Sequence, residues 1–365
     1  MKNIAMLAFF VVGSAYGTGL SLPEYGSVRE SMPGLKWKAN PESKLARQAD
    51  PGKIQMSVVA DFVGNLGEKE DPTVERFDFR EIEFGFASDV DPFLRAEAYI
   101  ALAKEDGETV VEVEEIFGKY TGLGHGLSAK VGKIAGAVGR VQRNHGDQLD
   151  YLEYPMVVQD VLGDEGLRRP GGSISYLFPS TQFRELTFEV LEPDTESPLF
   201  NRTDKDSPIF LGHFRTFFDF NEDLSAQLGF SGGTGPSLGD NTASLYGVDF
   251  TMKWRPGEKG KSANFEGEAI WSDAGGSAER TFGAFARATY EVAPRFFVTA
   301  GYDYSELPGS SDIRGGVLAG LTFAPTEFQK WRIEWQRIHS NFESSRNVLN
   351  IQFQWLIGAH PAHKY

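Results

Sequence analysis

The stretch Lys53–Phe62, KIQMSVVADF, is where the chain takes on a regular pattern of period two. Apolar side chains recur at every second position, with mostly polar side chains between them. The apolar positions are Ile54, Met56, Val58, Ala60 and Phe62. Successive side chains of a β-strand point to opposite faces, so the pattern predicts a strand with one apolar and one largely polar face. A strand that separates lipid from a wet barrel interior requires this alternation.

The same alternation returns along the rest of the chain. Each segment is ~9–13 residues long, which matches a tilted strand crossing the apolar band of a membrane. Short turns at one end alternate with longer loops at the other, as in bacterial barrels. We therefore predict an all-β fold, a transmembrane antiparallel β-barrel of about sixteen strands, with fourteen as the alternative count. The expected strands begin near residues 53, 76, 93, 109, 126, 172, 182, 208, 223, 242, 262, 280, 294, 311, 327 and 346.

Two segments depart from a clean alternation. In the second, the apolar positions Phe77 and Phe79 are out of step with Ile82, Phe84 and Phe86. A β-bulge, which inserts one extra residue into a strand, explains such a change of parity. The fourth segment, which begins near residue 109, is the other weak match to the pattern.

Composition limits the classes of function. The formal net charge is −15 at pH 7, which argues against a nucleic-acid partner because such binding needs a basic face. Cysteine is absent, so neither disulfides nor thiolate metal sites are available. We expect no cofactor. No motif marks a nucleophile with a fixed base, so we predict that the protein is not an enzyme.

The first seventeen residues have the pattern of an export signal. Lys2 supplies the positive end, residues 4–12 form an apolar core, and Ala15-Tyr16-Gly17 is a cleavage site of small residues. We expect 1–17 to be a signal peptide, 18–51 an irregular periplasmic lead-in with a small plug as the alternative, and 52–365 the barrel. This organisation predicts the outer membrane as the location.

One stretch, residues 139–171, interrupts the rhythm of strands and turns for far longer than the ~4–6 residues of a usual connection. It is rich in charge but also contains Leu149, Tyr151 and Leu152, which are too apolar for a loop left in water. We expect it to fold into the barrel as a constriction loop. A loop lying on the outer rim is the alternative.

Charged residues in and around this loop are the candidates for the narrow zone of a pore, where they would set a transverse field that sorts solutes. The predicted pore constriction consists of Arg140, Arg143, Asp147, Asp150, Asp160 and Glu165. The predicted lumen wall includes Arg95, Glu97, Arg215 and Glu268. We assign no metal site; His360 and His363 are weak candidates, because Pro361 opposes the helix that their spacing would need.

Taken together, the chain resembles a Gram-negative outer-membrane porin, and within that class the phosphate-selective porin O and P family and its uncharacterised relatives. The resemblance is at the level of pattern and covers about a third of the chain. It is carried by residues 79–86 (FREIEFGF), 111–117 (VEVEEIF), 131–133 (VGK) and 171–175 (GGSIS). It implies sixteen strands, a constricting loop and commonly a homotrimer. Phosphate selectivity in that family uses inward Arg and Lys, whereas the predicted inward positions here carry both signs.

We therefore expect a porin that allows passive diffusion of small hydrophilic solutes or ions, and that is non-selective or weakly cation-preferring. Its other partners would be outer-membrane lipid and the barrel assembly machinery. Two alternatives remain open. One is a metal- or anion-specific uptake channel or receptor-like barrel. The other is a structural, non-conducting barrel.

Overall fold

The computed structural model describes residues 53–67, 76–105, 108–193, 197–201, 207–237, 241–257 and 261–358. The expected signal peptide, the lead-in of residues 18–51 and the pair His360 and His363 lie outside the described residues. The described part of the chain forms sixteen strands and one α-helix. The strands are β1 (Gln55–Asn65), β2 (Phe77–Asp89), β3 (Leu94–Glu105), β4 (Glu108–Tyr120), β5 (Leu127–Ala135), β6 (Arg168–Leu177), β7 (Arg184–Leu191), β8 (Ile209–Asp219), β9 (Leu224–Ser237), β10 (Asn241–Trp254), β11 (Ala263–Asp273), β12 (Thr281–Ala293), β13 (Phe296–Glu306), β14 (Ile313–Thr326), β15 (Gln329–Ser340) and β16 (Arg346–Gly358).

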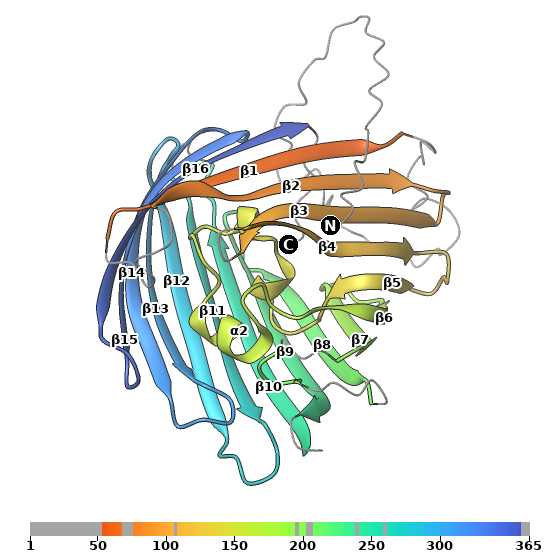
Figure 1. The fold of residues 1–365 in the computed structure, drawn as a ribbon. Helices are drawn as coiled ribbons and strands as arrows, with labels where there is room; N and C mark the ends of the chain where they lie inside the picture. Colours follow the sequence, from red (N-terminus) through yellow and green to blue (C-terminus); the bar gives the residue numbers. More distant parts are fainter. Residues whose placement is uncertain are drawn as a thin grey trace, which may run out of the picture. The chain divides into compact units, whose positions relative to one another are not determined.

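Every strand pairs antiparallel with its neighbour in sequence, and the first strand pairs with the last (Figure 1). The closing pair runs from Ser57 opposite Gly358 to Asn65 opposite Asn350. This closure leaves no free edge, so every strand has hydrogen-bonding partners on both sides. The prediction of a sixteen-stranded antiparallel barrel is confirmed. Fifteen of the sixteen predicted starts lie within two residues of the observed ones, and β6 begins four residues early.

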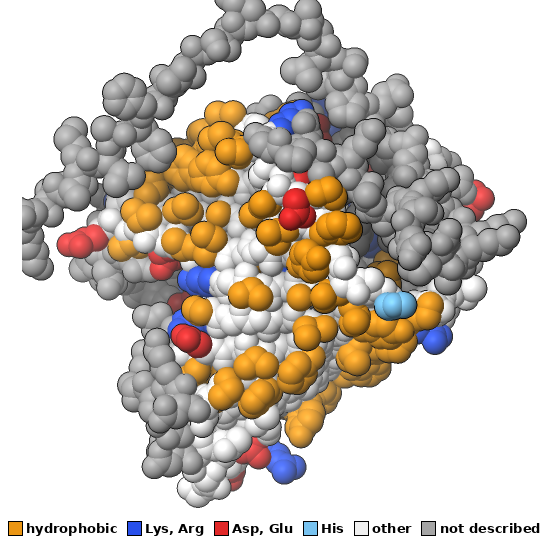
Figure 2. All heavy atoms as spheres, turned by 90° about the vertical axis from the view of Figure 1, so that its right-hand side faces the viewer, with side chains coloured by type: hydrophobic (Ala, Val, Ile, Leu, Met, Phe, Trp, Pro, Cys, Tyr) orange, Lys and Arg blue, Asp and Glu red, His pale blue; other side chains and the backbone are white. Residues whose placement is uncertain are grey.

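The alternation in sequence separates the two faces of the barrel wall. In β12, Thr281, Phe285 and Arg287 point inward and are buried, whereas Tyr290 on the other face is 44% exposed. The same division holds in β10, where Asp249 is 1% and Tyr246 65% exposed. Figure 2 shows one outer face, on which hydrophobic side chains predominate. The barrel therefore has an apolar exterior and an interior that combines polar and apolar groups.

Two β-bulges account for the segments in which the alternation fails. Between β1 and β2, Asp61 pairs with Glu81 and Phe62 pairs with Phe79, so that Arg80 is the extra residue. The bulge predicted in the second segment is thus confirmed. Between β3 and β4, a second register shift makes Glu114 the extra residue, because Tyr99 pairs with Glu115 and Ile100 with Val113. A bulge redirects side chains, and here it brings the neighbouring carboxylates of Glu114 and Glu115 into buried positions.

Asp61 joins the strands at the closing seam. Its carboxylate accepts hydrogen bonds from Gln352 Nε2 on β16, at 2.9 Å to each oxygen, and pairs with the guanidinium of Arg80 on β2. Asp61 is only 4% exposed. Removing it leaves the Gln352 amide without its acceptor and Arg80 with one carboxylate partner, Glu153, in place of two.

Substituting Asp61 with alanine should lower the free energy of unfolding by about 3 kcal/mol, because a buried amide loses its acceptor and a largely buried guanidinium loses one of its two carboxylates. The measurement is urea unfolding of the refolded barrel, followed by the change in gel mobility between folded and unfolded forms. The matched control is Asp89→Ala, which removes an ion pair with Arg95 at the end of β2 that is partly open to solvent. That change should cost about 1 kcal/mol or less. Equal losses in the two variants would contradict the role of the seam.

The single α-helix of the described residues, α2 (Met156–Leu162), belongs to the long connection between β5 and β6. It has seven residues. No described helix is long and apolar enough to pass through a membrane.

Candidate functional site

The connection between β5 and β6 comprises residues 136–167 and lies inside the ring of strands (Figure 1). It contains the 3-10 turns η1 (Val141–Arg143) and η2 (Gly146–Gln148), followed by α2. The predicted limits of 139–171 are corrected at the second end, because β6 already begins at Arg168. Ala135 pairs directly with Arg168, so the two strands continue their hydrogen bonding up to the base of the loop.

Apolar contacts hold this loop in the interior. Tyr151, Val157 and Val158 have no exposed surface, and they belong to one core cluster with wall residues such as Ile270 and Phe285. Burying side chains of this size stabilises the loop by about 1.5–3 kcal/mol for each fully buried residue. Two of the wall positions that receive α2 are glycines: a Cβ at Gly283 would lie 2.4 Å from Val157 Cγ2, and one at Gly316 would lie 3.4 Å from Met156 Cε.

The first part of the loop is attached to β9 and β11. The carboxylate of Glu268 accepts the backbone N–H groups of Arg140 and Val141 at 2.6 and 2.7 Å. The N–H of Gly139 donates to Ser231 Oγ at 2.8 Å. Gly139 has φ of 59°, and a Cβ there would lie 2.2 Å from Glu268 Oε2. Glycine is therefore required both for the backbone conformation and for the close approach to the carboxylate.

The middle of the loop is held by cations of β15. Lys330 Nζ donates to the carbonyl oxygen of Asp147 at 2.9 Å, and Arg332 Nη2 donates to that of Leu149 at 2.8 Å. From the same strand, Glu334 accepts the N–H of Leu152 at 3.1 Å. These wall charges satisfy loop backbone groups that would otherwise be buried without hydrogen bonds.

Two further arginines of the wall form hydrogen bonds and ion pairs with the loop. Arg80, the bulged residue of β2, donates to the carbonyl oxygen of Leu152 at 2.9 Å and pairs with Glu153 at 3.1 Å. Arg314 of β14 pairs with Asp160 on α2 at 2.6 Å. Because the contacts come from β2, β9, β11, β14 and β15, the loop is fixed to the wall at points widely separated along the strand order.

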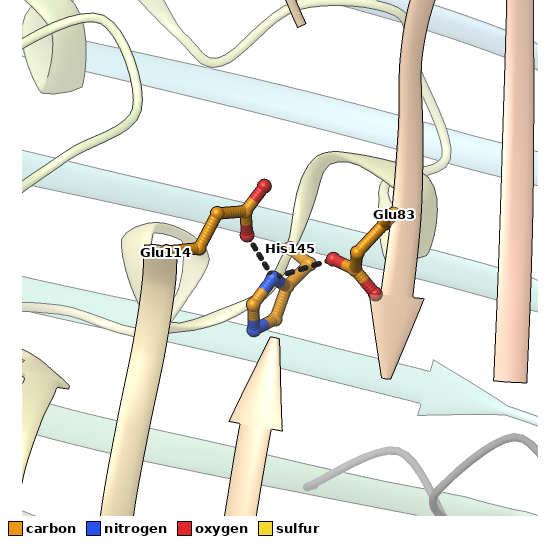
Figure 3. A group of neighbouring side chains, drawn as sticks. All are labelled: Glu83, Glu114 and His145. Carbon is orange, nitrogen blue, oxygen red and sulfur yellow. Dashed lines mark hydrogen bonds and ion pairs between the residues drawn. The ribbon is translucent and has the colours of Figure 1, made fainter. Parts of the chain in front are cut away.

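A buried polar cluster attaches the loop to β2 and β4 (Figure 3). His145 Nδ1 lies 2.9 Å from Glu83 Oε2 and forms a hydrogen bond with the Glu114 carboxylate, while His145 Nε2 lies 3.8 Å from Glu115 Oε2. The Tyr99 ring packs against the imidazole, with ring centroids 4.5 Å apart. Burial alone would lower the pKa of His145, but the charges of Glu83 and Glu114 outweigh it and raise that pKa well above its usual value.

The six predicted constriction residues lie along the loop, and three of them have side-chain partners on β11 or β14. Arg140 binds Glu266 of β11 at 2.7 Å, and Asp160 binds Arg314 of β14. Asp150 is exposed and accepts a hydrogen bond from the Asn264 amide at 3.2 Å. Their joint role as a pore constriction stays a prediction. The remaining three residues are Arg143 and Asp147, which are partly buried, and Glu165, which is exposed.

Arg143 differs from the other predicted constriction residues because a second cation, Arg215, lies near it. Burial and the nearby charge of Arg215 lower its pKa to about 10, although Asp249 acts in the opposite direction. At neutral pH the guanidinium remains charged.

The four predicted lumen-wall residues all lie on strands. Arg95 and Glu97 of β3 pair with one another at 2.9 Å. Arg215 of β8 pairs with Glu185 of β7 at 2.7 Å. Glu268 is 5% exposed and accepts the loop N–H groups described above. Glu268 therefore supports the loop more directly than it lines the wall.

Sequence reasoning missed the cluster of Glu83, Glu114 and His145. A signal was nevertheless present, because β2 and β4 are the strands with imperfect alternation and Glu114-Glu115 is a carboxylate doublet in the second of them. The missing information was the fold of the loop, which brings residue 145 next to two strands that are distant in sequence.

No protein-family model matches the chain. An uncharacterized protein of Aquifex aeolicus (strain VF5) is 25% identical over 350 residues, covering 83% of this chain and 72% of the relative. Among solved structures, the anion-selective porin from Comamonas acidovorans has a TM-score of 0.58 at 10% identity, covering 84% of this chain and 99% of that porin.

Pseudomonas putida OprB has a TM-score of 0.58 at 10% identity, covering 84% of this chain and 94% of OprB. Vibrio cholerae OmpT in its trimer form has a TM-score of 0.57 at 12% identity, covering 84% of this chain and 100% of OmpT. At sequence identities of 10–12%, the similarity shows that the fold is shared. It does not single out the phosphate-selective porin family.

Proposed function

We propose that the chain is an outer-membrane porin-type channel through which small hydrophilic solutes and ions diffuse passively. The observation that carries the proposal is the closed sixteen-stranded barrel with an apolar exterior and charged side chains on its inner face. Barrels of about this strand number normally enclose an aqueous channel. The apolar exterior suits a lipid environment, and export by a signal peptide and insertion by the barrel assembly machinery would follow.

The fully buried charges of the described residues are mostly carboxylates, whereas inward cations such as Arg80, Arg140 and Lys330 are only partly buried. Among the described buried side chains there are ten carboxylates and three arginines: Asp61, Glu83, Glu114, Glu115, Glu189, Asp249, Glu266, Glu268, Asp303 and Glu334 against Arg168, Arg287 and Arg332. An excess of carboxylates around a pore attracts cations. We therefore infer a weak cation preference rather than the phosphate selectivity that the family resemblance would imply. By analogy with the trimer form of Vibrio cholerae OmpT, a homotrimer is the assembly that we propose.

A structural, non-conducting barrel is the second candidate. It is favoured by the apolar core that the loop forms with inward residues of the wall, because this core fills part of the barrel cross-section. Swelling of liposomes that contain the refolded protein separates the two functions. Swelling in isotonic solutions of a small sugar, at rates that fall as the sugar becomes larger, is the result expected of a porin. A correctly folded barrel that gives no swelling would favour the structural function.

Substituting Asp150 with asparagine should reduce the preference for cations. Asp150 is exposed on the loop, and two unit charges about 8 Å apart in water interact by roughly 0.5 kcal/mol, which corresponds to about a twofold change in local ion concentration. We expect the ratio of cation to anion permeability to fall by up to about twofold at low salt and by less at high salt, because salt screens the charge.

The measurement is the reversal potential across a planar bilayer under a salt gradient. The matched control is Asp312→Asn, which removes the same charge from the loop between β13 and β14, outside the β5–β6 loop. If the two variants changed selectivity equally, the charge at Asp150 would have no special position in the ion path.

A further inference from the structure

The cluster of Glu83, Glu114 and His145 has the composition of a metal site. Each residue offers one ligand atom, these atoms all lie within 4.8 Å of one another, and all three side chains are buried. The residues come from β2, β4 and the loop, so one ion would join three separate parts of the barrel (Figure 3). We propose that the cluster binds a divalent first-row transition-metal cation, with Zn²⁺ as the probe.

The position of the imidazole supports this assignment. Two carboxylates, from Glu83 and Glu114, face the same ring nitrogen, Nδ1. A single N–H directs its hydrogen bond to one acceptor at a time, whereas a cation at this point is coordinated by both carboxylates together with Nδ1. Zinc binds imidazole and carboxylate ligands at about 2.0–2.2 Å, so a small outward rotation of the two carboxylates makes room for it.

A third carboxylate lies beside the other ring nitrogen, where a small shift would bring it within hydrogen-bonding distance. Glu115 Oε2 lies 3.8 Å from His145 Nε2, on the side of the ring away from Nδ1. A carboxylate that receives the second N–H of a metal-ligating histidine fixes the tautomer and makes the ring a better ligand. The Tyr99 ring, packed against the imidazole, restricts its rotation. Because Glu114 is the bulged residue of β4, the bulge supplies both a ligand and this supporting carboxylate.

The charge around the site also favours a divalent cation. Glu83, Glu114 and Glu115 place three carboxylates beside the imidazole nitrogens. Arg168 offsets part of this charge, but its guanidinium donates hydrogen bonds to Tyr154 Oη and the Asn144 carbonyl oxygen, both at 3.0 Å. A bound M²⁺ neutralises two of the negative charges. The imidazole proton is released to solvent as the ion binds.

The test is equilibrium dialysis of the untagged, refolded full chain against Zn²⁺. It is made in a background carrying His360→Gln and His363→Gln, so that the two terminal histidines cannot contribute. We expect one equivalent of zinc in this background and less than about a tenth of that occupancy, at the same free zinc, in His145→Gln or Glu83→Gln. Glu115→Gln should weaken the affinity by about 10-fold or more without changing the stoichiometry, as supporting carboxylates do.

The matched control is His213→Gln, which removes another buried histidine of the interior, one that pairs with a single carboxylate, Asp249, at 3.1 Å. It should keep the full equivalent of zinc. X-ray absorption at the zinc edge of the background protein gives a reading that does not depend on how the variants fold, and should show oxygen and nitrogen ligands with one imidazole. Equal zinc binding in the His145→Gln and His213→Gln variants, or no zinc bound to the folded background protein, would overturn the proposal. Neither result depends on whether the barrel conducts.

Discussion

Replacing residues 136–167 with an Asn-Gly turn should raise the single-channel conductance at least about twofold, because a filled part of the barrel becomes open to water. The replacement suits the backbone: Ala135 and Arg168 are directly paired, and Asn-Gly is the preferred two-residue connection of antiparallel strands. The deletion removes the apolar side chains of the loop and exposes the wall residues that they cover. Planar-bilayer recording of the refolded variant is the measurement.

The control replaces the loop between β13 and β14, residues 307–312, with the same Asn-Gly turn. Glu306 and Ile313 are likewise directly paired, and this loop lies at the same end of the barrel as the one between β5 and β6. Its replacement should leave the conductance nearly unchanged. If removal of residues 136–167 also left conductance unchanged in a folded barrel, the long loop would have no part in limiting the pore.

Enlarging Gly283 should push α2 away from the wall. A Cβ at this position would lie 2.4 Å from Val157 Cγ2 and 3.2 Å from the Tyr304 carbonyl oxygen. A valine side chain there overpacks the contact, which costs about 1–3 kcal/mol. The protein has no cysteine, so a single Val157→Cys substitution reports the position of the helix. Its reaction with a water-soluble maleimide should become about 10- to 100-fold faster when Gly283→Val is added.

Ala284→Val is the matched control, since Ala284 adjoins Gly283 on the other face of β12. It adds two carbon atoms to the side chain without meeting the loop, and the labelling rate should stay within about twofold of the parent. Equal acceleration by both substitutions would mean that α2 is not held by contact with Gly283.

The strand pattern was predictable because a barrel with an apolar exterior imposes one physical requirement on every strand. Each must be apolar on its outer face and compatible with the interior on the other, so the period of two recurs along the chain and fails at the bulges of β2 and β4. The start of β6 was predicted four residues late, because the segment Arg168–Gly171 begins with two arginines, a proline and a glycine. These residues are typical of a loop, yet Arg168 and Arg169 pair with Ala135 and Ile134 on β5.

The contacts of the loop were less predictable. Apolar residues such as Tyr151 and Val157 indicated that the loop would be buried, and they are fully buried. No local pattern, however, says that Glu268 receives the backbone of Arg140, or that Asp160 meets Arg314, since these pairs are separated by more than a hundred residues. The buried cluster around His145 depends on the same long-range packing and on a bulge that shifts the register of β4 at Glu114.

The most direct test of the proposed function is a planar-bilayer recording of the refolded wild-type protein under a tenfold salt gradient. We expect stable conductance steps and a reversal potential of the sign that marks a weak preference for cations, as the excess of buried carboxylates implies. A reversal potential of anion sign would contradict the proposed selectivity and favour an anion channel. A correctly folded barrel that produced no conductance steps would contradict the porin function itself.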